Sequence, residues 1–410
     1  MTFDCDIAVI GAGPAGSRTA RNLAQSGLRV RLLEEHRAVG VPSHCSGLIS
    51  LRTLREAEIG EEAAIHSITG AFVHAQSGSQ AALGGEKTQA VAIDRVKWDR
   101  TLAEQAQQTG AELVRARLTS VERENSHVKL HVQTDGRDST MTARMVVGAD
   151  GAHSRVARTL GMPRPAEYAY NLGIEGRLSP GAGAEWRDDF VHVFVGRDLA
   201  PGWFGWIIPT GDGVVRVGIG SSGREKPIEC YRRLALAFPA LFASIEPCRM
   251  YGGTIPLTFA PRSFDDNVLL VGDAAGQVKP FSGGGIYTSL VAARHASATV
   301  EKAFASGDFS AKLLASYERG WQREIGRELR KSWHLRHFGL ALSDSQVDRV
   351  VRALRGPKLQ ALAATHADID YPSRVLLRLA RSLPAMATLG WVTARRPGAA
   401  LNLVRAHLPL

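Results

Sequence analysis

The sequence is poor in cysteine and lacks the motifs of the common hydrolases. Its four cysteines, Cys5, Cys45, Cys230 and Cys248, form no CxxC pair. This argues against a zinc site, a disulfide framework and the cysteine-rich iron–sulfur module of an electron-transfer protein. GxSxG and HExxH are also absent, so serine-dependent or zinc-dependent hydrolysis is not indicated. We therefore predict no bound metal and no hydrolytic activity.

Long apolar runs are scarce as well, and we expect no N-terminal signal peptide. The first strand pattern starts at Asp6, which leaves no room for a signal peptide before it. The longest weakly polar stretch near the C-terminus, residues 383–394, is too short to span a bilayer and is flanked by Arg381 and Arg395. We expect a cytoplasmic protein that folds into two or three domains over its 410 residues.

Charge is unevenly distributed along the chain. Residues 310–410 contain 17 Lys and Arg against 7 Asp and Glu, while the formal charge of the whole chain is +10, so residues 1–309 are close to neutral. A basic region suits an anionic membrane surface or an acidic partner, or is simply a solvated helical face. Zinc-finger spacing and aromatic–basic RNA-binding patterns are absent, so we predict no nucleic-acid binding.

One part of this basic region is typical of a helix at a membrane surface. Residues 371–410 interleave basic side chains with leucines, alanines and Trp391. The arginines are Arg374, Arg378, Arg381, Arg395, Arg396 and Arg405. Such a segment can lie on an anionic interface, which predicts peripheral contact with the inner face of the membrane.

The N-terminal segment has the pattern of a dinucleotide-binding unit. An apolar strand, residues 7–10, leads into Gly11-Ala12-Gly13-Pro14-Ala15-Gly16, and a helical pattern over 17–26 follows. The three glycines allow a tight turn, a close backbone approach to a pyrophosphate and close packing of helix on strand. The next strand ends at Glu34, followed by Glu35, where a carboxylate can accept hydrogen bonds from a ribose diol. The segment predicts an adenine dinucleotide.

Two further motifs follow buried strands later in the chain. The first is Gly148-Ala-Asp150-Gly151, and the second runs from Gly272-Asp273 through Pro280 to Gly283-Gly284-Gly285-Ile286. Together with the N-terminal motif they resemble the FAD-dependent family of the p-hydroxybenzoate hydroxylase fold. The resemblance implies that Asp150 supports the dinucleotide and that Asp273 bonds the ribityl hydroxyls. It also implies that the helix start after Gly283 faces the flavin pyrimidine edge, where a helix N-terminus stabilises negative charge on reduced flavin.

The same resemblance adds two cofactor contacts. Arg95 opens a predicted helix over residues 94–110 and corresponds to an arginine that contacts the pyrophosphate in the family. The second contact that the resemblance implies is Leu118, which we also expect to bind FAD.

Differences within these motifs favour one branch of the family. Gly276 stands where aromatic hydroxylases usually carry His, and Gly285-Ile286 replaces their Gly-x-Asn. This version resembles the geranylgeranyl reductase branch, which saturates isoprenoid double bonds. Residues 41–48 are similar to its Pro-x-x-Cys-x-Gly segment, which implies that Cys45, Ser46 and Gly47 lie near the isoalloxazine. We take Cys45 as the first candidate proton donor and His44 as the second; from the residues alone, Cys45 can equally be a small buried hydrophobe.

A second segment of that branch lines the substrate cavity. Here it includes Trp203, Phe204, Trp206 and Pro209, with Phe204 replacing the commoner Tyr and Ile208 the commoner Phe. The resemblance implies that the cavity is apolar. Judged without it, Trp206 fits a hydrophobic core equally well.

The motif order predicts a discontinuous α/β architecture. We expect a Rossmann-like FAD-binding domain in residues 1–67, 92–165 and 256–309, as in the p-hydroxybenzoate hydroxylase fold. A mostly β substrate domain is expected in 68–91 and 166–255, and a basic helical region in 310–410. A protein of this type reduces carbon–carbon double bonds of a prenyl or lipid chain.

Three points stay open at this level. The electron donor is NADPH or a ferredoxin, since no second dinucleotide-binding domain for a nicotinamide cofactor is apparent in the sequence, and a redox partner protein is therefore one possibility. The alternative function is a flavin-dependent monooxygenase or halogenase, because Gly205-Trp206-Ile-Ile-Pro209 is close to a halogenase segment. The substrate head group and the oligomeric state are not encoded in any motif we recognise.

Overall fold

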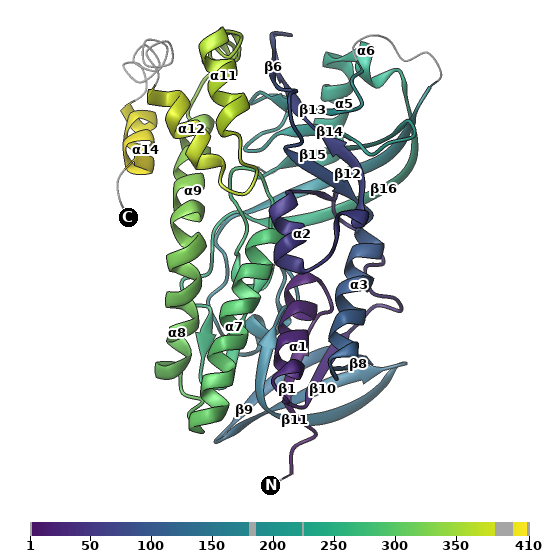
Figure 1. The fold of residues 1–410 in the computed structure, drawn as a ribbon, viewed down its shortest axis with the longest axis vertical. Helices are drawn as coiled ribbons and strands as arrows, with labels where there is room; N and C mark the ends of the chain where they lie inside the picture. The colour runs from purple at the N-terminus through teal and green to yellow at the C-terminus, as the bar shows by residue number, and fades with distance from the viewer. Residues whose placement is uncertain (1, 180–185, 224, 382–396, 408–410) are drawn as a thin grey trace.

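We describe the protein from a computed structural model, which covers residues 2–179, 186–223, 225–381 and 397–407. It contains two large β-sheets, a small sheet and a layer of C-terminal helices (Figure 1). The small sheet has the order β3-β7-β4. Its strands are β3 (Leu48–Ile49), β4 (Ala64–Ile68) and β7 (Ala90–Ile93).

The first large sheet has the parallel core that a dinucleotide-binding fold requires. Its parallel strands follow the order β18-β11-β1-β2-β8, and β17 (Phe264–Asp265) pairs antiparallel with β18. The parallel strands are β1 (Cys5–Ile10), β2 (Val30–Glu34), β8 (Glu112–Arg115), β11 (Arg137–Gly148) and β18 (Val268–Leu270). The antiparallel strands β9 (Arg117–Glu124) and β10 (His127–Thr134) extend this sheet from β11. The strand ends at Ile10, Gly148 and Leu270 lie in register with one another.

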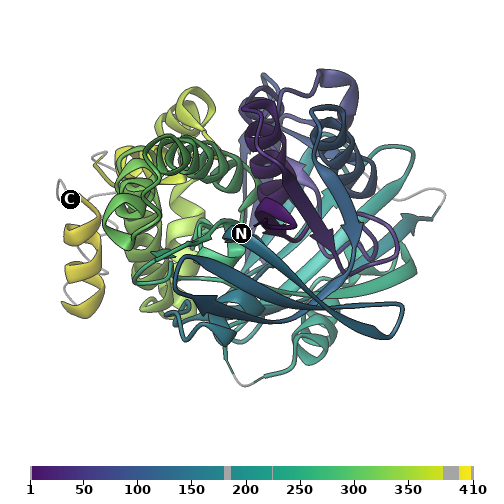
Figure 2. The same cartoon turned by 90° about the horizontal axis from the view of Figure 1, so that it is seen from below.

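Helices cover this sheet and bury its core. α1 (Pro14–Gln25) packs against α3 (Arg95–Gln108) and α7 (Ile286–Ser306), and α2 (Leu51–Ala57) packs on α7. Figure 2 shows these helices lying together on one side of the strands. A short helix, α4 (Arg155–Thr159), follows the second motif. The buried apolar side chains of β1, β2, α1 and α7 form one continuous cluster, so the three cofactor motifs are held by a single core.

The second large sheet is mostly antiparallel, with the order β16-β12-β15-β14-β13-β5-β6. Its strands are β5 (Gly70–Ala75), β6 (Gln80–Gly84), β12 (Tyr168–Leu178), β13 (Phe190–Val195), β14 (Gly205–Pro209), β15 (Val214–Ser221) and β16 (Ile245–Pro256). Only the β13–β5 pair is parallel among these strands. α5 (Pro227–Ala237) packs on β12 and β15, and α6 (Pro239–Phe242) follows it.

The C-terminal region is helical, as the sequence predicts. α8 (Ala311–Trp321) continues through a π-helical turn into α9 (Arg327–Leu340), and the two form a long rod beside α7 in Figure 1. Four shorter helices follow: α10 (Asp344–Ala353), α11 (Pro357–His366), α12 (Pro372–Arg381) and α14 (Pro397–His407). α10 packs on β5 and β6, α11 on β6, and α12 and α14 on α9. No helix in the described ranges is long and apolar enough to cross a membrane.

Most predicted elements agree with the structure, with one informative difference. The sequence pattern of residues 112–122 predicts one continuous strand, but the structure interrupts it at Ala116, whose N–H donates to the carbonyl of Glu34. The chain changes partner at this point, since β8 pairs with β2 and β9 pairs with β10. The division of residues among three domains stays a prediction.

Candidate functional site

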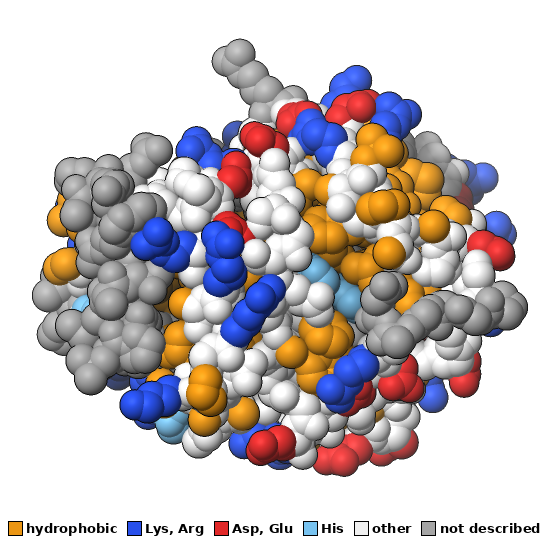
Figure 3. Space-filling model, turned by 90° about the horizontal axis from the view of Figure 1, so that it is seen from above, with side chains coloured by type: hydrophobic (Ala, Val, Ile, Leu, Met, Phe, Trp, Pro, Cys, Tyr) orange, Lys and Arg blue, Asp and Glu red, His pale blue; other side chains and the backbone are white. Residues whose placement is uncertain are grey.

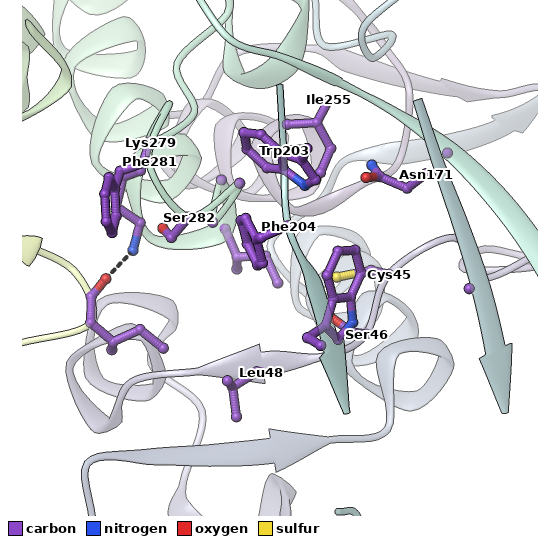
Figure 4. A pocket seen from close by; sticks show the side chains of 18 of the residues that line it. Cys45, Ser46, Leu48, Asn171, Trp203, Phe204, Ile255, Lys279, Phe281 and Ser282 are labelled. Carbon is purple, nitrogen blue, oxygen red and sulfur yellow. Dashed lines mark hydrogen bonds between the residues drawn. The ribbon is translucent and has the colours of Figure 1, made fainter. Parts of the chain in front are cut away.

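A single large cavity connects the cofactor motifs to the second sheet and the C-terminal helices. Its volume is about 1380 Å³. The glycine loop after β1 contributes one end of the lining, and α9, α10 and α11 contribute the other. Figure 4 shows Trp203, Phe204, Cys45 and Ser46 around this space, together with Lys279, Phe281 and Ser282 of the third motif.

The glycine loop leaves room for a phosphate group at the start of α1. A side-chain carbon added to Gly13 would meet no atom within 4 Å among the described residues. Gly13 is also the N-cap of α1, and no described side chain caps this helix or places an acid in its first turn. The free N–H groups and the positive end of the helix dipole therefore face the cavity, as a pyrophosphate requires.

Glu34 holds the glycine loop from the end of β2. Its carboxylate accepts a hydrogen bond of 2.9 Å from the Ala12 N–H and others from the N–H and ring Nδ1 of His36. Because a carboxylate has four lone-pair sites, Glu34 retains acceptor capacity for a ribose hydroxyl.

Two part-buried carboxylates mark the other motifs. Asp150 accepts hydrogen bonds from the N–H groups of Arg155 and Val156 through Oδ2, while its buried Oδ1 has no partner in the described structure. Burial raises the pKa of Asp150 despite these hydrogen bonds. Burial also raises the pKa of Asp273 to about 6, against the opposing charge of Arg95. Both carboxylates line the cavity and can accept hydrogen bonds from the hydroxyl groups of a bound molecule.

Arg95 connects the candidate pyrophosphate site with the Cys45 loop. Its guanidinium donates to both oxygens of Asp99, at 3.0 and 2.8 Å, and its side chain packs against Gly47, where an added side-chain carbon would be 3.3 Å from the Arg95 Cγ. Burial disfavours the charge, but Asp99 and Cys45 outweigh it and raise the pKa of Arg95. The Arg95 Nε has no partner among the described residues. Arg95 therefore brings a permanent positive charge to the cavity, and its Nε–H is free to donate a hydrogen bond.

The Cys45 loop is also fixed from the second sheet. Arg216 donates hydrogen bonds of 2.9 Å to the carbonyls of Ser46 and Ile93, and the Gly47 N–H donates to the Cys45 Sγ at 3.3 Å. Cys45 itself is half-buried and lines the cavity. This arrangement presents the thiol to the cavity.

The second sheet supplies a floor of large side chains with polar tips. Trp203 stacks on Phe204 with ring centroids 4.9 Å apart, and Trp206 lies 5.5 Å from Phe204. Four polar groups on this floor are buried without a partner among the described residues. They are the Asn171 Oδ1, the Trp203 and Trp206 Nε1 atoms and the Tyr251 hydroxyl. Burial raises the pKa of Tyr251 to about 12, so this hydroxyl is protonated and free to donate.

Beyond this floor the cavity is apolar. Its walls there come from β5, β6, β13, α9, α10, α11 and α12. Leucines and valines dominate these walls: Leu83, Val73, Val193, Val195, Leu335, Val347, Val350, Val351, Leu354, Leu359 and Leu376. Such a space suits a long hydrocarbon chain, because its walls offer that chain few polar partners.

Most of the predicted site residues line this cavity. They are Ala12, Gly13, Pro14, Ala15, Glu34, Glu35, His44, Cys45, Ser46, Arg95, Asp150, Gly151, Trp203, Phe204, Trp206, Asp273, Gly283, Gly284, Gly285 and Ile286. The structure thus brings together residues from all the predicted segments, which lie far apart in the sequence.

The remaining predicted residues lie in the packing around the cavity. Gly16 approaches the Gly11 carbonyl so closely that an added side-chain carbon would be 1.8 Å from it. Leu118 lies on β9 with its side chain buried in the core, and Pro209 ends β14. Gly47 and Gly272 have positive φ angles of 68° and 70° in the turns after Cys45 and before Asp273, and Pro280 lies in the glycine-rich loop.

Sequence reasoning missed several residues that line the cavity. Asn171, Tyr251 and Ile255 lie on strands β12 and β16, where no local motif distinguishes them. Lys279 lies within the third motif, but the family resemblance assigns it no role. Arg336 and the apolar side chains of α10 belong to the region interpreted only as basic and helical. These residues reach the cavity because segments far apart in the sequence pack together, and no local sequence pattern indicates this.

The residues present fit an FAD. The cavity offers two helix N-termini without capping side chains, at Gly13 and Gly285, among the described residues. It also presents buried polar atoms in need of partners, on Arg95, Asp150 and Ser282 at the motif end. A dinucleotide with a pyrophosphate, ribityl hydroxyls and a polar ring edge would satisfy such groups, as buried polar groups require.

Comparison with known proteins agrees with this assignment. The model of the FAD binding domain family matches residues 4–324. A digeranylgeranylglycerophospholipid reductase from Methanothrix thermoacetophila is 30% identical over 393 residues, which cover 92% of this chain and 96% of the relative.

Solved structures share the fold. A geranylgeranyl bacteriochlorophyll reductase-like protein from Thermoplasma acidophilum superposes with a TM-score of 0.82 at 24% identity, covering 95% of this chain and 99% of that one. The flavin-dependent halogenase CmlS is more distant, with a TM-score of 0.64 at 20% identity over 96% of this chain and 78% of its own. The chain therefore belongs to the FAD binding domain family and, within it, to the geranylgeranyl reductase family, and it is an FAD-dependent oxidoreductase.

Proposed function

We propose that this protein reduces carbon–carbon double bonds in the prenyl chains of a glycerophospholipid. The observation that carries the proposal is the apolar extension of the cavity, which continues from the Trp203–Trp206 floor to α10 and α11. A small aromatic substrate would not need this extension, whereas an isoprenoid chain would fill it. The name of the Methanothrix relative supports the same substrate class.

The residues around the floor would position the double bond and exclude water. An isolated alkene is poorly activated, so its reduction depends on orientation in a dry pocket. Reduced FAD supplies the hydride when bound. Trp203, Phe204 and Trp206 hold the chain against it, and the Cys45 thiol, with His44 as the second candidate, delivers a proton to the other carbon.

The decisive experiment offers two kinds of substrate to the reduced protein. The FAD-loaded protein is reduced with dithionite without oxygen and mixed with a digeranylgeranylglycerophospholipid or with a panel of aromatic compounds. We expect the lipid to gain two hydrogen masses for each bond reduced. Insertion of oxygen or halogen into an aromatic product after air and halide are admitted would instead support the monooxygenase or halogenase alternative and overturn the proposal.

The electron donor in this proposal is NADPH or a reduced ferredoxin. Mixing the oxidised protein with each donor under argon distinguishes them, because the flavin absorbance near 450 nm is lost only with the productive donor. A rate that saturates with NADPH indicates direct nicotinamide binding, whereas reduction by ferredoxin alone indicates a redox partner protein.

We further propose that the protein docks on the inner face of the membrane through its C-terminal helices. α12 carries the exposed residues Arg374, Arg378 and Arg381, and α14 exposes Leu401 and Val404 beside Arg405. Trp391, Arg395 and Arg396 of the predicted segment lie outside the described residues. Figure 3 shows hydrophobic side chains in the middle of the upper face, with both basic side chains (Lys, Arg) and acidic ones (Asp, Glu) around them.

Vesicle sedimentation tests this docking. We expect binding to vesicles that contain phosphatidylglycerol and weak binding to vesicles of phosphatidylcholine alone. The Val404→Asp variant should weaken binding without changing FAD content. Equal sedimentation with both kinds of vesicle would contradict an electrostatic contribution, and sedimentation with neither would refute docking.

A further inference from the structure

A buried ion pair lies beside the glycine-rich loop of the third motif. The Lys279 Nζ donates hydrogen bonds to the Asp370 Oδ1 at 3.2 Å and to the Ile369 carbonyl at 2.6 Å. The two charged side chains are 4% and 3% exposed. Burying two charges costs several kcal/mol per ion by general experience, so such a pair seldom stabilises a fold more than apolar side chains would. Its presence at the cavity wall calls for a role other than stability.

Lys279 lies directly against the part of the loop assigned to the flavin. A side-chain carbon added to Gly284 would be 2.8 Å from the Lys279 Cε and 3.0 Å from its Nζ. Gly284 precedes Gly285, the N-cap of α7, for which no capping side chain is found among the described residues. The ammonium group and the positive end of the α7 dipole therefore converge on the same end of the cavity. Figure 4 shows Lys279 hydrogen-bonded at this wall, in the loop of Phe281 and Ser282.

The negative partner comes from the C-terminal helices. Asp370 lies in the connection between α11 and α12, and it also accepts hydrogen bonds from the Ser50 hydroxyl and, at 3.4 Å, from Arg52. A second buried carboxylate, Glu328 on α9, is held by Ser332 and Ser373 and interacts with the charge of Lys279. Lys279 thus faces the cavity with its counter-charge on the helical region that covers the substrate space.

We propose that Lys279 and Asp370 set the reduction potential of the bound FAD by opposing charges. Reduction of oxidised FAD takes up two electrons and one proton, and it leaves one negative charge on the pyrimidine side of the isoalloxazine. Charge near this edge tunes the potential. The Lys279 ammonium stabilises the added negative charge, and the Asp370 carboxylate counteracts it. The inference rests on the FAD site and deepens the proposed function.

The experiment measures midpoint potentials of the FAD-loaded protein by spectroelectrochemistry, without any prenyl substrate. Lys279→Met should lower the potential, so that the ratio of reduced to oxidised FAD at a fixed applied potential becomes roughly tenfold smaller. For a two-electron couple this corresponds to a shift of about 30 mV. Asp370→Asn should raise the potential by a similar factor. The double variant removes both charges and should return the potential close to that of the parent. Lys279→Arg should preserve it.

Matched measurements separate this role from structural loosening. Arg294→Met removes a cation from α7 that is paired with Glu56 and Glu324, and it should leave the potential unchanged. If the Lys279 and Asp370 variants shift the potential in the same direction, or leave it unchanged, the proposal is overturned. If the larger substitutions release FAD, Ser50→Ala provides a milder test. It removes one hydrogen-bond donor to Asp370 and should lower the potential slightly.

The outcome is independent of the substrate assignment. Opposite shifts in a protein that fails to reduce prenyl lipids would support the charge pair and refute the proposed function. If the protein reduces prenyl lipids but all variants have the same potential, the proposed function would be supported and the role of the charge pair refuted.

Discussion

The indole of Trp206 on β14 lies flat on the backbone of Gly218, its register partner on β15. A side-chain carbon added at Gly218 would be 2.1 Å from the indole Cε2 and Cζ2. Since Trp206 lines the cavity, the absence of a side chain at Gly218 fixes the height of the floor under the substrate. The pair therefore links a glycine in a strand interior to the shape of the active site.

The first prediction concerns this floor. In Gly218→Ala the new methyl group pushes the indole of Trp206 into the cavity, so the prenyl chain no longer fits its position. We expect kcat/KM to fall by roughly 10- to 100-fold, as for a displacement of about 1 Å near the reacting atoms, with FAD affinity unchanged. Steady-state kinetics and flavin fluorescence titration measure the two quantities. Gly398→Ala on α14, where an added carbon would meet no described atom, is the control and should behave like the parent.

The cofactor end of the site could be predicted from the sequence because its signals are local. Gly11 has a φ angle of 97°, which only glycine adopts readily, and Gly16 packs on the same turn; these requirements appear as fixed spacings in one short segment. Asp150 and Asp273 follow buried strands in the same way. Parallel strands then bring all these ends to one edge of the sheet.

The substrate end could not be predicted to the same extent. Tyr251 and Asn171 are on neighbouring strands whose register no local pattern reveals, and Lys279 meets Asp370 across 91 positions of the sequence. α10 was expected only as part of a basic helical region. Its apolar face packs on β5 and β6 and forms a wall of the cavity, which depends on tertiary packing rather than on composition.

The second prediction concerns the thiol of the Cys45 loop. Cys45→Ala removes the Sγ that interacts with Arg95 and the Gly47 N–H, and with it the first candidate proton donor. We expect turnover to fall by about 100-fold, within the range for general acid catalysis, while FAD stays bound. Anaerobic single-turnover oxidation of the flavin by the lipid measures the step. Unchanged turnover would exclude Cys45 as the donor and leave His44 to be tested in the same way.

The third prediction is a pH dependence of stability. His74 and His192 are buried on β5 and β13, joined by a 3.0 Å hydrogen bond between ring nitrogens. Burial, with the neighbouring imidazole, lowers the pKa of His74 to about 3, and burial lowers that of His192 to about 4, from 6.5. The unfolded chain binds protons below pH 6.5 while the folded protein does not. Stability is therefore full above about pH 6.5 and is lost as the pH falls toward 4.

Urea unfolding at a series of pH values measures this effect. Each histidine contributes a slope of at most about 1.4 kcal/mol per pH unit. The double variant His74→Phe/His192→Phe should lose this slope between pH 6 and pH 4.5. A parent and variant with the same slope would show that the pair is not the source of the pH dependence.

The last prediction concerns the attachment of α9 to the second sheet. Glu167, just before β12, accepts hydrogen bonds from Arg336 at 2.8 Å and Trp333 at 3.3 Å, and it pairs with His337. Hydrogen bonding from His337, together with the charge of Arg336, lowers the pKa of Glu167 to about 2 despite partial burial. Its contribution to stability is present above pH 4.5 and is lost as the pH falls toward 2.

Glu167→Gln should destabilise the protein because it leaves the charge of Arg336, whose side chain is 5% exposed, without its carboxylate. We expect a loss of about 2 kcal/mol, less than for a fully buried pair, since Glu167 is partly exposed and screened by water. The double variant Glu167→Gln/Arg336→Met removes the stranded charge, so it should recover part of this loss. Chemical unfolding of the three proteins at pH 7 decides the point. If the double variant is less stable than Glu167→Gln alone, α9 is held by the other contacts of Arg336, which are its position over the Trp203 ring and its hydrogen bonds to the Gly202 carbonyl and the Ser222 hydroxyl, and not by its charge pair with Glu167.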